Sequence, residues 1–305
     1  MYDLIIIGGG PGGVSAGIYA SRKQLKTLFI TKDWGGQSTV SPDIQNWIGT
    51  PSISGSDLAK NLEGHLRTYA SEWVTIIENQ FVVNIAKSDA GFTATLADGS
   101  VHESRAVLIT TGSNRRKLTV PGAETFDNKG ITYCASCDGP LFSGQDVVVI
   151  GGGNAGFESA AQLLAYTKSV TLLHHGPAFK ADPVTVEKVL SHPNMTGIVG
   201  AKTKEIKGTN FVSSIVYEKD GVDNELPTAG IFVEIGLVPS TEFVSNLVAL
   251  DEYKRIKIDP WTQQTNILGI WAAGDCTNIK YHQNNISAGD AVRALEDIYV
   301  HLKTK

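Results

Sequence analysis

Cysteine is scarce in this sequence, with three residues among 305, and that scarcity excludes two kinds of protein. Small secreted domains held together by a disulfide framework carry a much higher share of cysteine. A structural zinc site needs a second group of soft ligands at metal spacing. There is no second C-x-x-C, and the seven histidines form no C-x-x-C…H-x-x-x-H arrangement, so we expect no metal site.

Long apolar runs and strong net charge are also missing. No segment of the sequence is apolar for long enough to span a bilayer. Residues 2–7 are mostly apolar, but they stop at glycine and lack a basic start and a cleavage site, so they predict a strand and not a signal peptide. The formal charge of −5 is mild, which argues against nucleic acid or an anionic membrane as a partner. We expect a cytoplasmic protein.

Glycine, by contrast, forms two similar clusters. The first, at residues 8–13, follows the apolar run Leu4–Ile7 and precedes a predicted helix over Val14–Lys23 and a strand over Thr27–Thr31. The second cluster, at residues 151–156, has the same surroundings: we predict strands at 146–150 and 169–173 and a helix at 157–166. Each cluster therefore lies in a β-α-β unit of the dinucleotide-binding type.

Two such units far apart in the sequence predict an α/β protein with two Rossmann-like, three-layer nucleotide-binding domains. Further buried strands are expected at 106–112 and 269–275, with short alternating strands between the two units. We place the crossings between domains near 113–118 and 236–241. The first domain then comprises residues 1–113 and 242–305, and the second, residues 114–241, is inserted in it.

The spacing of glycines in each cluster is G-x-G-x-x-G. The first glycine permits a tight bend, the second lets a pyrophosphate approach the backbone, and the third lets the helix and strand pack closely. The helix N-terminus then faces the phosphates with unpaired N–H groups. A glycine turn with no ligand is the alternative. Near the C-terminus, Asp275 follows a strand end, where it binds a ribose or ribityl hydroxyl or else caps a helix; spacing does not decide between these.

Between the two clusters lies a C-x-x-C unit, Cys134 and Cys137, followed directly by Asp138. A thiolate is the reactive form of cysteine, and a C-x-x-C at a helix N-terminus has a lowered thiol pKa. A neighbouring carboxylate can shuttle the proton that thiol–disulfide exchange requires, although Asp138 also suits a turn or a helix cap. Two nucleotide sites and one dithiol indicate an electron relay that leaves through a disulfide.

The segment from Tyr133 to Leu141 resembles the corresponding segment of low-molecular-weight thioredoxin reductases, and the resemblance extends over essentially the whole chain. Supporting segments lie at 35–37, 45–47, 110–112 and 274–277. The C-terminal half is most similar to the reductase portion of the alkyl hydroperoxide reductase flavoprotein, through residues 171–173, 180–182 and 229–237. That flavoprotein has an additional thioredoxin-like domain, so the redox partner here is expected to be a separate protein.

The resemblance implies FAD at the first glycine cluster and a redox-active disulfide. It implies that Cys137 faces the flavin, Cys134 attacks the partner disulfide and Asp138 is the acid–base residue. The partner would be a thioredoxin- or glutaredoxin-like protein, and the enzyme a homodimer. The residues implied in binding FAD are Gly8, Gly10, Pro11, Gly13, Gly36, Gln37, Asn46, Thr111, Gly112, Gly274, Asp275, Gln283 and Asn284.

The chain departs from this family at the second nucleotide site. NADPH-using members follow the second fingerprint with His-Arg-Arg and a further arginine, whereas this sequence has His174, His175 and Lys180. Arginine offers phosphate a bidentate fork that these residues lack. An NADH user would place Asp or Glu at the strand end. We therefore expect atypical or absent NADPH use, with ferredoxin as a possible donor. A second nucleotide, NADPH or NADH, would contact Gly151, Gly153, Asn154, Gly156, His174, His175 and Lys180.

Three other functions are compatible with parts of this pattern. A flavin-dependent NAD(P)H oxidase would not need Cys134 or Cys137, so their presence counts against it. A flavin-dependent dithiol oxidase would keep the dithiol and run the exchange in reverse with oxygen. A non-enzymatic redox sensor would use FAD and the disulfide to report on the cell.

Overall fold

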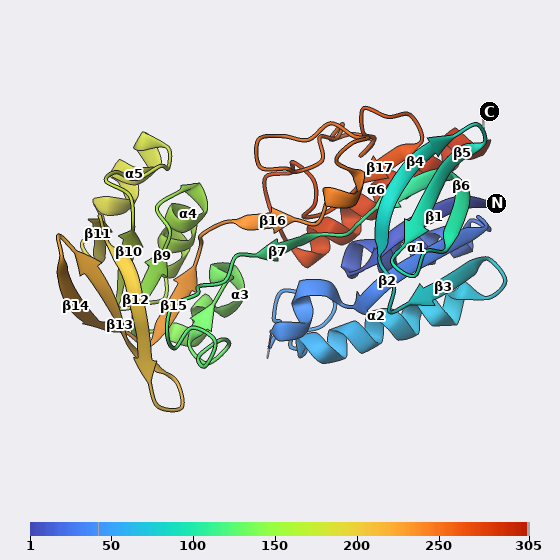
Figure 1. Ribbon diagram of the computed structural model, residues 1–305. Helices are drawn as coiled ribbons and strands as arrows, with labels where there is room; N and C mark the ends of the chain where they lie inside the picture. The colour runs from blue at the N-terminus through green and yellow to red at the C-terminus, as the bar shows by residue number, and fades with distance from the viewer. Residues whose placement is uncertain (42, 304–305) are drawn as a thin grey trace. The chain divides into compact units, whose positions relative to one another are not determined.

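The computed structural model describes residues 1–41 and 43–303. The chain divides into two compact units, Met1–Asn114 with Val238–Lys305 as unit 1 and Arg115–Leu237 as unit 2 (Figure 1). Unit 2 interrupts unit 1 in the sequence, as the predicted fold requires. No helix among the described residues is long and apolar enough to cross a membrane.

Unit 1 is built on a sheet of parallel strands with an antiparallel extension. The parallel strands lie in the order β3 (Val74–Glu78), β2 (Thr27–Trp34), β1 (Tyr2–Gly9), β6 (Val101–Ile109) and β17 (Ile270–Ala272). The first half of β6 pairs instead with the antiparallel hairpin of β5 (Gly91–Leu96) and β4 (Val82–Ser88). The core segments of the central strands, Leu4–Ile7, Leu28–Ile30 and Ala106–Ile109, are apolar because both faces of this sheet are covered.

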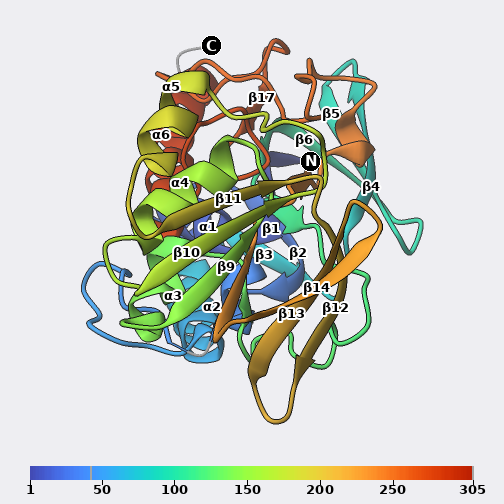
Figure 2. The ribbon, with the colours of Figure 1, turned by 90° about the vertical axis from the view of Figure 1, so that its left-hand side faces the viewer.

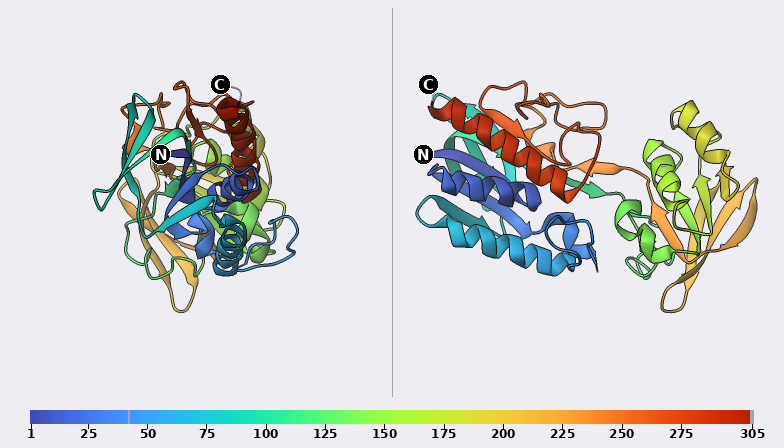
Figure 3. Two further views of the ribbon diagram at one scale, coloured as in Figure 1. Left: turned by 90° about the vertical axis from the view of Figure 1, so that its right-hand side faces the viewer. Right: turned by 180° about the vertical axis from the view of Figure 1, so that it is seen from behind.

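Three helices cover one face of this sheet: α1 (Pro11–Arg22), α2 (Gly55–Ala70) and α6 (Asn284–Lys303). Figure 3 shows α6, in red, lying alongside α1 on that face. Leu4 and Ile6 of β1 point into this helical layer, whereas Ile5 and Ile7 point to the opposite core. The opposite core is closed by β4, β5 and the segment around η3 (Glu242–Val244), which gives three layers.

Unit 2 repeats this plan (Figure 2). Its parallel sheet has the order β11 (Met195–Val199), β10 (Ser169–His174), β9 (Asp146–Ile150), β15 (Gly230–Val233) and β8 (Ile131–Thr132). One face packs on α3 (Ala135–Asp138), α4 (Asn154–Leu163) and α5 (Pro183–Leu190). The other packs on an antiparallel sheet of β12 (Lys202–Gly208), β13 (Val212–Lys219) and β14 (Val222–Pro227). Two Rossmann-like, three-layer domains are thus confirmed.

The chain crosses between the units through two short strands, β7 (Ser113–Arg115) and β16 (Leu237–Pro239), which pair with each other. The changeover falls at 114/115 and 237/238, beside the sequence-based limits of 113/114 and 241/242. Two further 3-10 turns, η1 (Gly36–Val40) in unit 1 and η2 (Gly139–Phe142) in unit 2, lie close to predicted site residues.

Candidate active site: two nucleotide turns and a dithiol

The first glycine turn has a geometry that only glycine permits at two positions. Gly8 has φ +119°, and a Cβ there would lie 2.4 Å from the Thr110 carbonyl oxygen. A Cβ on Gly13 would lie 1.8 Å from the Gly8 carbonyl oxygen. Such distances are far inside van der Waals contact, so both glycines are needed for the turn from β1 into α1 to close.

The middle glycine of the same turn faces open space. A Cβ on Gly10 would meet no atom within 4 Å, apart from its immediate neighbours. Gly36 lies across from Gly10, since a Cβ on Gly36 would come 3.6 Å from the Gly10 Cα. Helix α1 begins at Pro11 with Gly10 as N-cap and no side-chain cap. Uncapped N–H groups at a helix N-terminus bind phosphate, so this cradle fits a pyrophosphate.

Polar side chains from distant segments of unit 1 meet near this turn. The Asn46 amide donates to Gln283 Oε1 at 3.1 Å, and Asn285 donates to the Asn46 carbonyl at 2.7 Å. The Ser38 hydroxyl donates to Asn284 Oδ1 at 2.9 Å. These bonds tie the segment after β2 to the first turn of α6. Gln37, on η1 in the segment after β2, is exposed.

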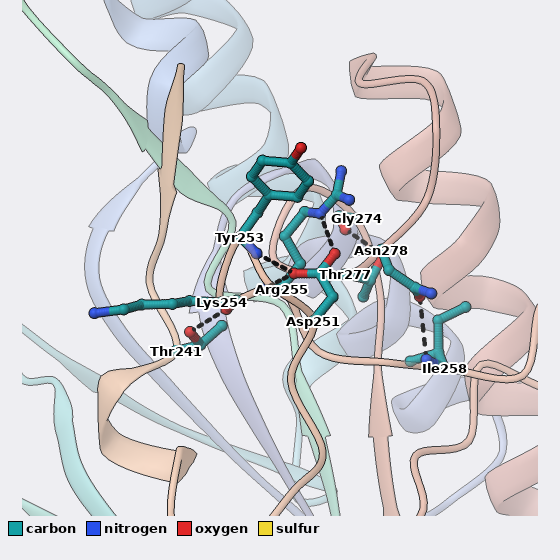
Figure 4. A network of polar contacts seen from close by, with 9 residues as sticks. All are labelled: Thr241, Asp251, Tyr253, Lys254, Arg255, Ile258, Gly274, Thr277 and Asn278. Carbon is teal, nitrogen blue, oxygen red and sulfur yellow. Dashed lines mark hydrogen bonds and ion pairs between the residues drawn. The ribbon is translucent and has the colours of Figure 1, made fainter.

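Gly274 follows β17, and the chain bends there so that Asp275 lies beside the start of α6. Gly274 has φ +76°, and the Asp275 carboxylate lies 3.3 Å from His282 Nδ1 and 3.4 Å from the Ser287 hydroxyl. Thr277 holds the bend, since its hydroxyl donates to the Gly274 carbonyl at 2.8 Å (Figure 4).

Two other predicted FAD residues lie at the end of β6. The Thr111 hydroxyl donates to the Ser240 carbonyl at 2.7 Å. Gly112 has φ +62°, and a Cβ there would meet no atom within 4 Å, apart from its immediate neighbours. Thr111 is therefore held by the backbone, while Gly112 leaves the space beside it open.

In unit 2, Cys134 and Cys137 are joined as a disulfide with Cα atoms 5.3 Å apart. Cys134 is the N-cap of the single-turn helix α3, and its Sγ accepts the Cys137 N–H at 3.2 Å. Both residues are half-buried. The predicted position of the dithiol at a helix start is therefore observed, in a turn that directly follows β8.

Asp138 is turned back toward β8. Its Oδ2 accepts a hydrogen bond from the Thr132 hydroxyl, while its Oδ1 is buried with no hydrogen-bond partner among the described residues. Burial raises the pKa of Asp138, and the Thr132 hydrogen bond and the positive charge of Arg115 oppose that rise. Asp138 is the N-cap residue of η2, although its side chain makes no capping hydrogen bond.

The third cysteine has a different environment. Cys276 is fully buried in unit 1, and its thiol donates weakly to the Ala273 carbonyl. Burial raises the pKa of the Cys276 thiol to about 11. A buried thiol that stays protonated is a poor nucleophile, so Cys276 is a packing residue.

The second glycine turn has almost the same geometry as the first. Gly151 has φ +129°, and a Cβ on Gly156 would lie 1.8 Å from the Gly151 carbonyl oxygen. A Cβ on Gly153 would meet nothing within 4 Å, apart from its immediate neighbours, and α4 begins after it without a side-chain cap. Asn154 Oδ1 accepts the Asp182 N–H at 2.8 Å. This turn also fits a phosphate.

The end of β10, beside this turn, carries a buried imidazole. His174 is 4% exposed, and a Cβ on Gly152 would lie 2.6 Å from its ring. Its two ring nitrogens are buried and form no hydrogen bond of normal geometry among the described residues, although one interacts weakly with the Ala178 backbone. Burial, reinforced by His175 and Lys180, lowers the pKa of His174, so the ring is neutral at pH 7. His175 and Lys180 are exposed.

Two residues beside these sites were not predicted as site residues: Thr132, which precedes the dithiol, and Glu234, whose carbonyl oxygen would lie 2.1 Å from a Cβ on Gly151. Thr132 bonds Asp138, and Glu234 accepts a 2.7 Å hydrogen bond from Ser159. A carboxylate directly after the apolar strand at 230–233 is the signal that would have identified Glu234. As for metals, no cluster of three or more potential ligands occurs in the described part of the chain.

With these sites in place, the comparison with known families is direct. The profile of the pyridine nucleotide-disulphide oxidoreductase family matches residues 2–289, so the chain belongs to that family. Within it, the expected likeness to low-molecular-weight thioredoxin reductases is confirmed. The thioredoxin reductase of Streptococcus pyogenes is 32% identical and superposes with a TM-score of 0.91, covering 100% of this chain and 99% of that one.

Two curated relatives are longer than this chain. A subunit of the alkyl hydroperoxide reductase of Staphylococcus epidermidis is 41% identical over 295 residues, and a protein named NADH dehydrogenase from Bacillus subtilis is 39% identical over 295 residues. Each match covers 96% of this chain but 57% of the relative. The chain thus corresponds to little more than half of those proteins.

Proposed function

We propose that this protein is an FAD-dependent disulfide reductase that passes electrons through Cys134 and Cys137 to a thioredoxin- or glutaredoxin-like protein. The observation that carries the proposal is the disulfide between these cysteines, with the raised-pKa carboxyl of Asp138 next in sequence. A proton donor and acceptor beside a dithiol is what disulfide exchange requires.

The exchange transfers two electrons and two protons from the enzyme dithiol to the partner disulfide. The Cys134 thiolate attacks one partner sulfur, the partner S–S bond breaks, and a mixed disulfide forms. The Cys137 thiolate then attacks Cys134 Sγ, which re-forms the enzyme disulfide and releases the partner dithiol. Asp138 takes the proton from a thiol as it becomes a nucleophile and returns it to a departing thiolate.

The cradle of unit 1 suits FAD, which when bound would supply the electron pair that reduces the disulfide. Gly10 and Gly36 leave room for the pyrophosphate, and the N-terminus of α1 offers it N–H groups. Asp275 is placed to accept a hydrogen bond from a hydroxyl of the ligand. The Asn46–Gln283 pair fixes the segment after β2 over the start of α6.

The electron donor is proposed to be unusual. At the second turn the strand end carries neither the carboxylate that binds ribose hydroxyls nor an arginine for a 2′-phosphate. His174 is neutral and buried, so Lys180 is the cation that this edge presents, next to the exposed imidazole of His175. NADPH would bind weakly, and NADH would also lack its usual carboxylate, so a reduced ferredoxin is a further candidate donor.

The reductase is favoured over an NAD(P)H oxidase because an oxidase has no use for the dithiol. A dithiol oxidase and a redox sensor would use the same cysteines, and turnover with a partner disulfide separates them from a reductase. A homodimer in the cytoplasm is part of the proposal and follows from the family likeness. The name of the Staphylococcus relative, which belongs to an alkyl hydroperoxide reductase, favours a partner within a peroxide-reducing system.

The cysteine roles are tested with a matched pair of variants. Cys137→Ser should accumulate a mixed disulfide between Cys134 and a thioredoxin-type protein, detected by mass spectrometry, whereas Cys134→Ser should not. Asp138→Asn should keep the disulfide but slow turnover by about 10²-fold or more. Full reductase turnover by Cys134→Ser would refute the proposal.

The donor is tested by anaerobic bleaching of the flavin absorbance with NADPH, NADH and reduced ferredoxin, each supplied alone. Slow or absent bleaching by NADPH is expected. Rapid bleaching at micromolar NADPH would show that the His174–Lys180 segment binds the 2′-phosphate after all, and would make this an ordinary NADPH-dependent reductase.

A further inference from the structure

Cys134 is joined to the core of unit 2 by little regular structure. Strand β8, which leads to it, has two residues, Ile131–Thr132, and pairs with β15 at the edge of the sheet. Cys134 then has an extended backbone, with φ −142° and ψ 99°, before α3 begins. Because so short an edge strand has few ladder hydrogen bonds, contacts of the neighbouring side chains decide how firmly Cys134 is placed.

The two residues before Cys134 are held on opposite faces of this strand, because successive side chains on a strand alternate. The Thr132 hydroxyl donates to Asp138 Oδ2. Tyr133 packs instead against the core that faces the antiparallel sheet, and its hydroxyl donates to Asp127 Oδ1 at 2.9 Å. Burial raises the pKa of Tyr133, and the hydrogen bond to Asp127 adds to the rise, so the phenol keeps its proton and donates it.

Asp127, the acceptor for Tyr133, is itself fixed by a side chain and by the backbone. Its Oδ2 accepts a hydrogen bond from Lys117 Nζ at 2.5 Å. The Asn128 N–H donates to the Ile131 carbonyl at 3.1 Å, which closes the turn that leads from Asp127 into β8. The Asp127 side chain is 18% exposed and that of Lys117 66%. An exposed ion pair contributes little, so Lys117 orients the carboxylate and the bond to Tyr133 has the larger effect.

The sulfur of Cys134 depends on this placement. Cys134 Sγ accepts the Cys137 N–H at 3.2 Å, and the Ser136 hydroxyl lies 3.5 Å from the same sulfur. The next carboxyl along the chain is that of Asp138. N–H groups at the start of a helix stabilise a thiolate, and they do so only while the sulfur stays within hydrogen-bonding distance. A shift of the strand end would therefore make Cys134 a weaker nucleophile near neutral pH.

We propose that Tyr133, held by Asp127, is a positioning residue for Cys134. The hydrogen bond between these side chains keeps the Cys134 sulfur at the start of α3, where the Cys137 N–H stabilises the thiolate that attacks the partner disulfide. Tyr133 acts through the backbone that it shares with Cys134, and Lys117 acts through Asp127. The inference rests on the proposed role of Cys134 as the attacking nucleophile.

The test is the pH profile of Cys134 alkylation by iodoacetamide, followed by mass spectrometry. The full chain carries Cys137→Ser, which leaves Cys134 and the buried Cys276 as its thiols. Adding Tyr133→Phe should move the profile to higher pH and slow alkylation near neutral pH by roughly threefold, because the thiolate is then held less firmly beside the N–H group.

The partners of Tyr133 give the next comparison. Asp127→Ala should have the effect of Tyr133→Phe, and the double variant should have no larger one, because both changes remove the same hydrogen bond. Lys117→Gln should shift the profile less, since the lysine is mostly exposed. Additive shifts in the double variant would overturn the inference.

Two matched controls lie in the same unit. Tyr217→Phe removes the hydroxyl of another tyrosine that packs against the same core, and Lys168→Gln removes another exposed ion pair, the one with Asp146. Both should leave the profile unchanged. An unshifted profile in Tyr133→Phe, or an equal shift in Tyr217→Phe, would refute the positioning role. Alkylation needs neither donor nor partner, so a shifted profile in a chain that reduces no disulfide partner would keep the positioning role and reject the reductase.

Discussion

The two glycine turns of this protein are close to identical as backbones and different as sites. In each, the first glycine has a positive φ, +119° at Gly8 and +129° at Gly151. In each turn, a Cβ on the third glycine would lie 1.8 Å from the carbonyl oxygen of the first glycine. The second glycine of each turn faces open space. The fingerprint therefore specifies a strand-to-helix turn that leaves room for phosphate, and nothing more about the ligand.

The two turns differ in the residues that flank them. Beside the first turn, the second strand of the unit has the small side chain of Thr31, which packs against Gly9. By the strand registers, His174 takes the place of Thr31 beside the second turn, where it packs against Gly152. The first turn is faced by Gly36 and a polar network, whereas the second is flanked by a neutral imidazole. Specificity must be read from these flanking residues.

The largest expected effect comes from filling the open position of each turn in parallel variants. Gly10 and Gly153 both have extended backbones that alanine tolerates, so Gly10→Ala and Gly153→Ala should fold, at a cost of about 1 kcal/mol or less. A methyl on Gly10 would occupy the phosphate cradle, and FAD affinity should fall by at least about tenfold, or ~1.4 kcal/mol. Flavin content of the purified chain measures this.

Gly153→Ala is the matched control for the same experiment. It should retain full FAD, because the methyl lies in the other unit. Loss of flavin in both variants would mean that the effect comes from general misfolding, which circular dichroism and thermal unfolding would reveal.

A smaller effect is expected from restoring a phosphate-binding side chain at the second turn. His175 is exposed, so His175→Arg adds a guanidinium beside Lys180 without disturbing the core. A fully formed charged hydrogen bond contributes roughly 1.5–3 kcal/mol, but an exposed arginine is screened by solvent, so NADPH affinity should rise by less than about tenfold while NADH affinity changes little. Calorimetric titration with both nucleotides measures the ratio. An equal gain for NADH would show that the arginine does not contact the 2′-phosphate.

The smallest effect concerns acid stability and the buried imidazole that distinguishes the second turn. Burial holds the pKa of His174 below its usual 6.5, so as pH falls below 6.5 the unfolded chain binds a proton that the folded chain does not. Folding stability should therefore decrease with falling pH in that window, by at most about 1.4 kcal/mol per pH unit. His174→Leu should flatten this slope in urea unfolding curves, whereas His175→Asn should keep most of it.

Much of the fold could be predicted from the sequence because local patterns specify it. The run of apolar residues before each glycine cluster predicted β1 and β9, and the helices α1 and α4 begin inside the clusters, at Pro11 and Asn154. The boundaries differ by a few residues: α4 starts at Asn154, not 157, because the helix opens directly at the turn. Such differences are expected at helix ends, where backbone hydrogen bonds begin.

The site was less predictable because its parts come from distant segments. Asn46 and Gln283 are 237 residues apart in sequence yet share a hydrogen bond. The burial of His174 depends on Gly152 and Gly176, which leave room for its ring. Nor does any local motif reveal that the Ser159 hydroxyl donates to Glu234, which lies 75 residues further along the chain. Such relations arise from tertiary packing, which periodicity and spacing do not encode.

The close spacing of the two cysteines has a thermodynamic consequence. The disulfide joins residues three apart, so it closes a very small ring. Cross-linking a loop of about four residues removes little entropy from the unfolded chain, about 2 kcal/mol in the chain-entropy account, against nearly 5 for a loop of a hundred. Opening this bond is therefore expected to cost unit 2 less stability than opening a disulfide across a long loop would. If the proposed reduction takes place, the bond can be opened and closed at each turnover with a smaller loss of stability than a long-range disulfide would bring.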